Sequence, residues 1–81
     1  MCVGNFEIMY DKGYDVALSV LIPTENSLDG CQAWCIAENM ACYAVDYKDK
    51  LCRMIYKEDQ NGNLIVNVGN IHSVLRPCDA R

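Results

Sequence analysis

The segment CQAWCIAENMACYAVDYKDKLC, residues 31–52, carries four of the six cysteines of this 81-residue chain and decides its fold. Cys2 and Cys78, near the two ends, complete an even set. A domain of this length buries only roughly 60% of its unfolded surface, so its core alone leaves it marginally stable. Three disulfides would supply the missing stability by restricting the unfolded chain. Because such bonds persist in oxidising compartments, the pattern predicts a secreted or extracellular protein.

A four-thiolate zinc site is the second interpretation of the same cysteines. Structural zinc sites usually combine short, paired C-x-x-C-like motifs. Here a single C-x3-C motif is followed by gaps of six and nine residues, and the two terminal cysteines have no metal role. We therefore expect disulfides, with no metal and no cofactor, although six cysteines allow about 15 pairings.

Composition narrows the classes of partner. The net charge is −4 and there is a single histidine, which argues against binding to nucleic acid or to an anionic membrane. The longest apolar stretch, residues 16–22, is too short for membrane insertion. Cys2, Asn5 and Glu7 interrupt any apolar leader, so no signal peptide is recognised. We expect residues 1–81 to form a single domain excised from a larger secreted protein.

Apolar alternation and turn residues predict most of the secondary structure. Strands are expected over 6–10, 16–22, 42–47, 51–56, 64–68 and 71–75, with turns at 11–13 and 48–50 and a hairpin at Asn61-Gly62. Pro23 should end the second strand. On the strand over 42–47, alternation places Tyr43, Val45 and Tyr47 on one face.

One helix is expected between the second and third strands. Ser27 is a suitable N-cap for a helix from about Leu28 to Asn39, and Asp29 suits its first turn. A helical period places Leu28, Cys31, Trp34 and Cys35 on one stripe, which should face the core. Sequence pattern thus predicts an α+β fold, a small disulfide-rich domain with an antiparallel β-sheet cradling one α-helix.

Disulfide pairing follows from this arrangement. Cys35, the second cysteine of the helix, can bridge the short corner between the helix and the strand over 42–47. Cys31, the first, can reach the neighbouring strand over 51–56, so the two terminal cysteines are left to pair with each other. We therefore expect the pairs Cys35–Cys42, Cys31–Cys52 and Cys2–Cys78.

Four short motifs, taken in order, resemble the PAN/apple domain family. They are Gly13-x-Asp15, Cys31-Gln32-x-x-Cys35, Cys42-Tyr43-x-Val45-x-Tyr47 and Cys52-x-Met54. The resemblance spans Cys2 to Cys78 and implies the same nested pairing, with the terminal bridge typical of the apple subtype. Tyr10, where the family often has phenylalanine, and Pro77 depart from the pattern.

The resemblance implies a non-catalytic module that binds proteins or carbohydrate. The residues agree that the chain is not an enzyme and has no catalytic residues. His72 and Ser73 are adjacent on an expected strand, so their side chains point to opposite faces and cannot form a dyad. The carboxylates Asp46, Asp49, Glu58 and Asp59 are interpreted as solvated surface charge.

Three functional hypotheses remain. The first is a protein–protein adhesion module with an extracellular protein partner. The second is a lectin-like or glycosaminoglycan site, because basic residues gather close to the aromatic residues Tyr47 and Tyr56. Its candidate ligand-binding residues are Tyr47, Lys48, Lys50, Arg53 and Lys57. The third is a structural spacer or homodimerisation domain. Since Cys52 must face the helix, Arg53 should point outward and Tyr56 inward.

Overall fold

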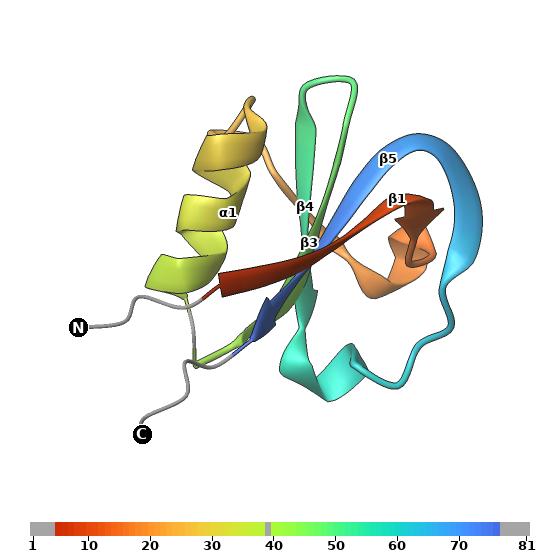
Figure 1. Ribbon diagram of the computed structural model, residues 1–81. Coiled ribbons are helices and arrows are strands. Elements are labelled where there is room, and N and C mark those ends of the chain that lie inside the picture. The colour runs from red at the N-terminus through yellow and green to blue at the C-terminus, as the bar shows by residue number, and fades with distance from the viewer. Residues whose placement is uncertain (1–4, 39, 77–81) are drawn as a thin grey trace.

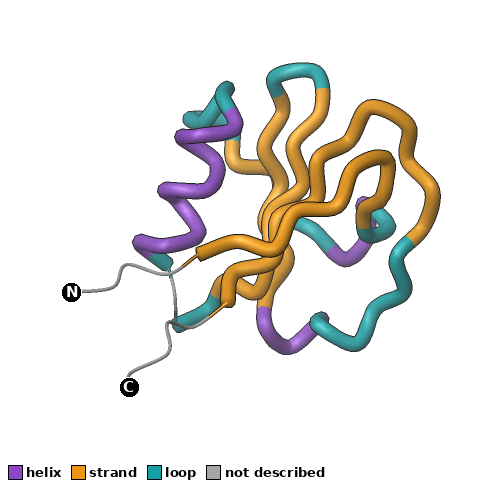
Figure 2. Tube along the Cα trace, viewed as in Figure 1, coloured by secondary structure: helices purple, strands orange, loops and turns teal. Residues whose placement is uncertain are grey.

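The computed structural model describes residues 5–38 and 40–76 of the chain. Its elements are β1 (Asn5–Gly13), a short 3-10 helix (Val16–Leu18), β2 (Val20–Ile22), α1 (Leu28–Ala37), β3 (Cys42–Lys48), β4 (Leu51–Tyr56), a second 3-10 helix (Lys57–Asp59) and β5 (Ile65–Arg76). The strands form a five-stranded antiparallel sheet in the order β1-β5-β3-β4-β2. The helix α1 lies across one face of this sheet, as Figures 1 and 2 show. The expected α+β class and helix-on-sheet packing are confirmed.

The helix begins where its sequence predicts. Ser27 is extended, and its hydroxyl accepts a hydrogen bond from the Gly30 amide at 3.0 Å, which satisfies one of the free donors of the first turn. The helix ends at Ala37, two residues before the expected end. Its two cysteines are completely buried.

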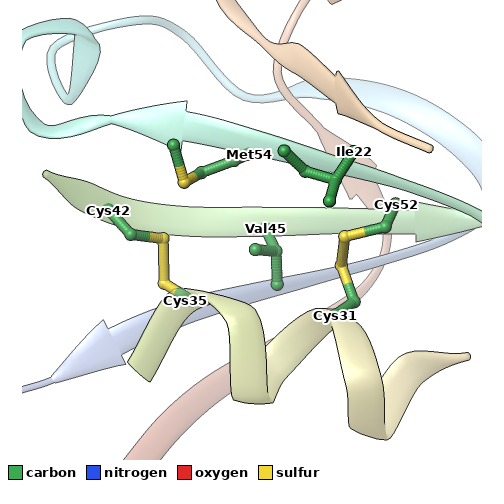
Figure 3. Close-up of a cluster of buried hydrophobic side chains, with 7 residues drawn as sticks. All are labelled: Ile22, Cys31, Cys35, Cys42, Val45, Cys52 and Met54. Atoms are coloured by element: carbon green, nitrogen blue, oxygen red, sulfur yellow. A yellow bond between two sulfur atoms is a disulfide. The ribbon is translucent and has the colours of Figure 1, made fainter. Parts of the chain in front are cut away.

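The core between helix and sheet is the helix-side cluster, shown in Figure 3. It contains Ile22, Cys31, Cys35, Cys42, Val45, Cys52 and Met54. The disulfides Cys31–Cys52 and Cys35–Cys42 join α1 to β4 and β3, which confirms these two expected pairs. Trp34 packs against the same cluster, in agreement with a core position. The expected Cys2–Cys78 pair lies outside the described residues.

The other face of the sheet, which we call the far face, has a smaller apolar core. This far-side cluster contains Tyr14, Ala44, Ile55 and Val74, and Leu18 and Tyr43 pack against it. Tyr43 was expected to share a face with Val45 and Tyr47. That expectation is wrong, because a register shift between Cys42 and Ala44 breaks the alternation at this point.

Three other expectations about local structure are wrong. Residues 16–22 are not one strand, because Asp15 accepts a hydrogen bond from the Ala17 amide and starts a 3-10 turn, and only Val20–Ile22 pairs. Asn61-Gly62 is not a hairpin, since β4 and β5 are separated by β3 and residues 57–64 cross between them. The two segments expected over 64–75 form the single strand β5.

The expected turn at 11–13 is instead a kink inside β1. Asp11 adopts a φ of 62°, a conformation that aspartate tolerates better than most residues. The pairing partner moves from Ile71 opposite Tyr10 to Val66 opposite Lys12. Residues 67–70 of β5 therefore bulge out opposite Asp11, and this β5 bulge is visible as the arc of β5 in Figure 1.

Candidate functional site

The β5 bulge forms one wall of an open hollow on the far face. The hollow has a volume of about 310 Å³ and is lined by Tyr14, Val16, Asp46, Lys48, Asp49, Leu51, Arg53, Asn67 and Asn70. These residues come from the segment after β1, from both strands of the β3–β4 hairpin and from β5. The far face therefore presents a concave surface lined by both polar and apolar residues, whereas the helix covers the other face.

A buried carboxylate lies at the base of the hollow. Asp46 is only 5% exposed, and one of its oxygens accepts a hydrogen bond from the Tyr14 amide at 3.0 Å. Its other oxygen accepts from Nδ1 of His72 at 2.5 Å, and His72 is itself buried. The expectation of a solvated Asp46 is thus wrong, because these donors replace the water that the carboxylate loses on burial.

Tyr14 covers this pair. Its ring stacks on the His72 ring with the centroids 5.3 Å apart, and its hydroxyl donates to the Gln60 carbonyl at 2.6 Å. Burial is the main cause that raises the pKa of Tyr14 to about 12, with the nearby Tyr43 as the second. The tyrosine is therefore a neutral hydrogen-bond donor at physiological pH.

Hydrogen bonds hold the β5 bulge in place around the hollow. The Gly69 amide, at a φ of 88°, donates to the Asp11 carboxylate at 2.8 Å. Asn70 donates from its side chain to the Lys12 carbonyl at 2.6 Å. A Cβ atom at Gly13 would lie 2.6 Å from the side-chain amide nitrogen of Asn70 and 3.0 Å from an Asp46 oxygen, so any larger residue here would have to displace these two side chains.

The two cations of the hollow differ in their contacts. Lys48 donates to the Asn67 side chain at 3.0 Å. Arg53 lies directly opposite Asp46 in the β3–β4 pairing, yet among residues 5–38 and 40–76 the ion pairs are Asp46–His72 and Glu7–Arg76. Within the described chain Arg53 therefore has no carboxylate partner, while Asp46 is bonded elsewhere.

Sequence reasoning placed five residues in one site, and the structure brings two of them together. Lys48 and Arg53 line the hollow, and Lys50 lies between them in the sequence, in the turn of the β3–β4 hairpin. Lys57 lies beyond the other end of β4. Tyr47 packs on the helix-side cluster and donates its hydroxyl to the Asn26 carbonyl at 3.0 Å.

On β4 and β5, the side chains point to the faces of the sheet that strand alternation predicts. Tyr56 packs with Cys52 on the helix-side cluster, while Arg53 lines the hollow on the far face. His72 contacts Asp46 on the far face, whereas Ser73 accepts a hydrogen bond from Gln32 of the helix at 3.1 Å. The two side chains do point to opposite faces.

Sequence reasoning missed the other lining residues, above all Tyr14, Asn67 and Asn70. Tyr14 directly follows Gly13, which lies close to the Asp46 carboxylate. This glycine is the one local signal for the hydrogen bond between Tyr14 and Asp46. The asparagines belong to a bulge whose existence depends on pairing between β1 and β5, residues nearly 60 positions apart. No local pattern marks them.

Within the described ranges, no group of three or more histidine, cysteine, aspartate or glutamate side chains is arranged to hold a metal ion. No helix in that part of the chain has the length and hydropathy needed to cross a membrane. No protein-family model matches the chain, and neither the curated proteins nor the solved structures include a significant match.

Proposed function

We propose that this chain is a non-catalytic extracellular binding module of the PAN/apple type, with the hollow as its binding site and another extracellular protein as its ligand. The observation that carries this proposal is Arg53, a cation at a concave surface without a carboxylate partner among the described residues. A cation without a carboxylate partner at a concave surface is available to bind an anionic group of a ligand.

Other features support the proposal. Both described disulfides have the inner pairing that the PAN/apple resemblance implies, and disulfides are typical of oxidising compartments. His72 is buried and bonded to Asp46, and Ser73 lies on the opposite face. This arrangement offers no nucleophile and base within reach of each other, which favours binding without catalysis.

A charge-matched pair of variants tests the proposal. The refolded domain and both variants would be screened for capture of extracellular proteins and on a glycan array. Lys48→Gln with Arg53→Gln removes two positive charges from the hollow, whereas Lys50→Gln with Lys57→Gln removes two from outside it. We expect only the first variant to lose its partner. Equal loss in both would indicate non-specific charge, and no capture by the wild-type domain would favour a spacer or dimerisation domain.

Carbohydrate binding is the second candidate function. The hollow offers hydrogen-bond donors and acceptors side by side, from Asn67, Asn70 and Asp49 among others, and sugar hydroxyls use both. A glycan hit that free sugar competes away, and that the hollow variant loses, would favour this function over protein adhesion.

A further inference from the structure

Exposed aliphatic side chains lie beside Arg53 or line the same hollow. Leu21 of β2 lies directly opposite Arg53 in the antiparallel pairing, so both side chains stand on the far face. Leu51 precedes it by two residues on the same strand face and lines the hollow with Val16. Val16, Leu21 and Leu51 are 60%, 41% and 51% exposed, although each is apolar. We call these three residues the collar.

The collar distinguishes this surface from an ordinary polar groove. Isolated exposed apolar residues are common, but three at the same hollow as an arginine resemble the pattern of an interface centre. Arginine is enriched at such centres, and apolar neighbours that exclude water strengthen its hydrogen bonds. The guanidinium group also matches a carboxylate with two parallel bonds.

Charge complementarity defines the ligand group. The Asp46 carboxylate beside Arg53 is already bonded to Tyr14 and His72, so it does not compete for the guanidinium. Of the other charged residues that line the hollow, Lys48 adds a positive charge and Asp49 a negative one, so the preference for an anion comes from Arg53 itself. A neutral sugar would leave this arginine without an anion and would place hydroxyl groups against the collar, which costs desolvation.

We propose that the hollow binds an acidic peptide segment of a partner protein. A glutamate or aspartate carboxylate of the segment is held by Arg53, and aliphatic residues next to it pack on the collar. This inference rests on the proposed function, because it assigns a ligand class to the same hollow.

NMR titration of the domain with short peptides tests this ligand class directly. The isotope-labelled domain would be titrated with the capped peptide Gly-Leu-Glu-Leu-Gly, with its Gln analogue, and with an analogue in which Ser replaces both Leu residues. We expect the Glu peptide to shift the Arg53 Nε–H signal and the methyl signals of Leu21 and Leu51. The Gln analogue should bind about tenfold more weakly, since a charge-assisted hydrogen bond becomes a neutral one. The Ser analogue should also bind more weakly.

Variants of the domain complete the test. Arg53→Gln should remove the preference for the Glu peptide, and Arg53→Lys should keep part of it. Lys57→Gln is the matched control and should bind like the wild type. Equal binding of the Glu and Gln peptides, shifts confined to residues outside the hollow, or no shifts at all would each overturn the inference.

The outcomes separate this inference from the proposed function. If the peptides fail while protein capture still depends on Lys48 and Arg53, the domain remains a binding module but its ligand is not an acidic segment. If N-acetylneuraminic acid shifts the Arg53 signal and the peptides do not, the acidic-peptide inference is wrong and the carbohydrate function is favoured. If neither capture nor peptide binding occurs, both proposals fail.

Discussion

On the helix side of the sheet, two disulfides and a continuous apolar cluster join α1 to the strands, whereas on the far face a buried carboxylate organises the chain through hydrogen bonds. The first face is closed by covalent bonds and water exclusion, which tolerate little rearrangement. The second has a smaller apolar cluster and leaves an open hollow beside it. The helix side is therefore the covalently stabilised part of the domain, and the far face carries the candidate site.

The largest loss of stability is expected from removing a disulfide on the helix side. Replacing Cys31 and Cys52 with alanine opens a loop with a sequence separation of 21, which costs roughly 3–4 kcal/mol in the loop-entropy model. Both sulfurs are completely buried, so lost packing adds to this cost. Replacing Cys35 and Cys42, separated by only 7 residues, should cost less, roughly 2–3 kcal/mol. Urea denaturation measures the stability of both variants, and the reverse ranking would contradict the loop-entropy argument.

On the far face, the residue that should contribute most to stability is Asp46. Asp46→Ala leaves the Tyr14 amide and the His72 ring as buried donors without their acceptor, and we expect a loss of about 3 kcal/mol in the free energy of unfolding. Glu58→Ala, an exposed carboxylate on the second 3-10 helix, is the control and should change stability by less than about 0.5 kcal/mol. Similar effects of both changes would mean that the buried network contributes little.

Alkaline pH should lower the stability of the protein by a smaller amount, through Tyr14 on the far face. The pKa of Tyr14 in the folded protein is about 12, against an ordinary 10.0, because burial disfavours the tyrosinate. The neutral form stabilises the fold fully below pH 10, and this contribution is lost as the pH rises from 10 through 12.

Tyr14→Phe provides the control for this pH dependence. The variant loses the hydrogen bond to Gln60, which costs about 1 kcal/mol at neutral pH, but its stability should fall less between pH 10 and 12. Urea denaturation at several pH values measures the difference. Parallel pH profiles for wild type and variant would show that Tyr14 does not control the alkaline loss.

The same contrast explains what the sequence could and could not predict. Cysteine spacing, the Ser27 cap and the apolar stripe of α1 are local signals, and they predicted the helix, its two bridges and the facing of Cys52 and Arg53. The far face depends on contacts between distant residues: Tyr14 with Asp46, and Asn70 with Lys12. A polar side chain in an alternating strand is normally assigned to solvent, so the burial of Asp46 had no signal in its own segment.

Long-range pairing also accounts for the errors in topology. An Asn-Gly dipeptide between two strands is a strong hairpin signal only when those strands are neighbours in the sheet. Here β3 lies between β4 and β5, so residues 57–64 cross over instead. Asp11 similarly supplies a positive φ at a bulge: between the pairs Tyr10–Ile71 and Lys12–Val66, β1 has one residue and β5 has four.

The smallest expected effect on stability is that of Arg53, and it separates folding from binding on the far face. Arg53 has no ion pair among residues 5–38 and 40–76, and its neighbours Leu21 and Leu51 are apolar. Arg53→Met keeps the aliphatic volume beside these leucines, so we expect the free energy of unfolding to stay within about 0.5 kcal/mol of the wild type. Thermal or urea denaturation measures it beside the peptide titration. A loss of more than about 1.5 kcal/mol would show that the arginine supports the fold, and the reason for assigning it to a ligand would disappear. An unchanged stability together with lost binding would mean that this residue serves the ligand alone.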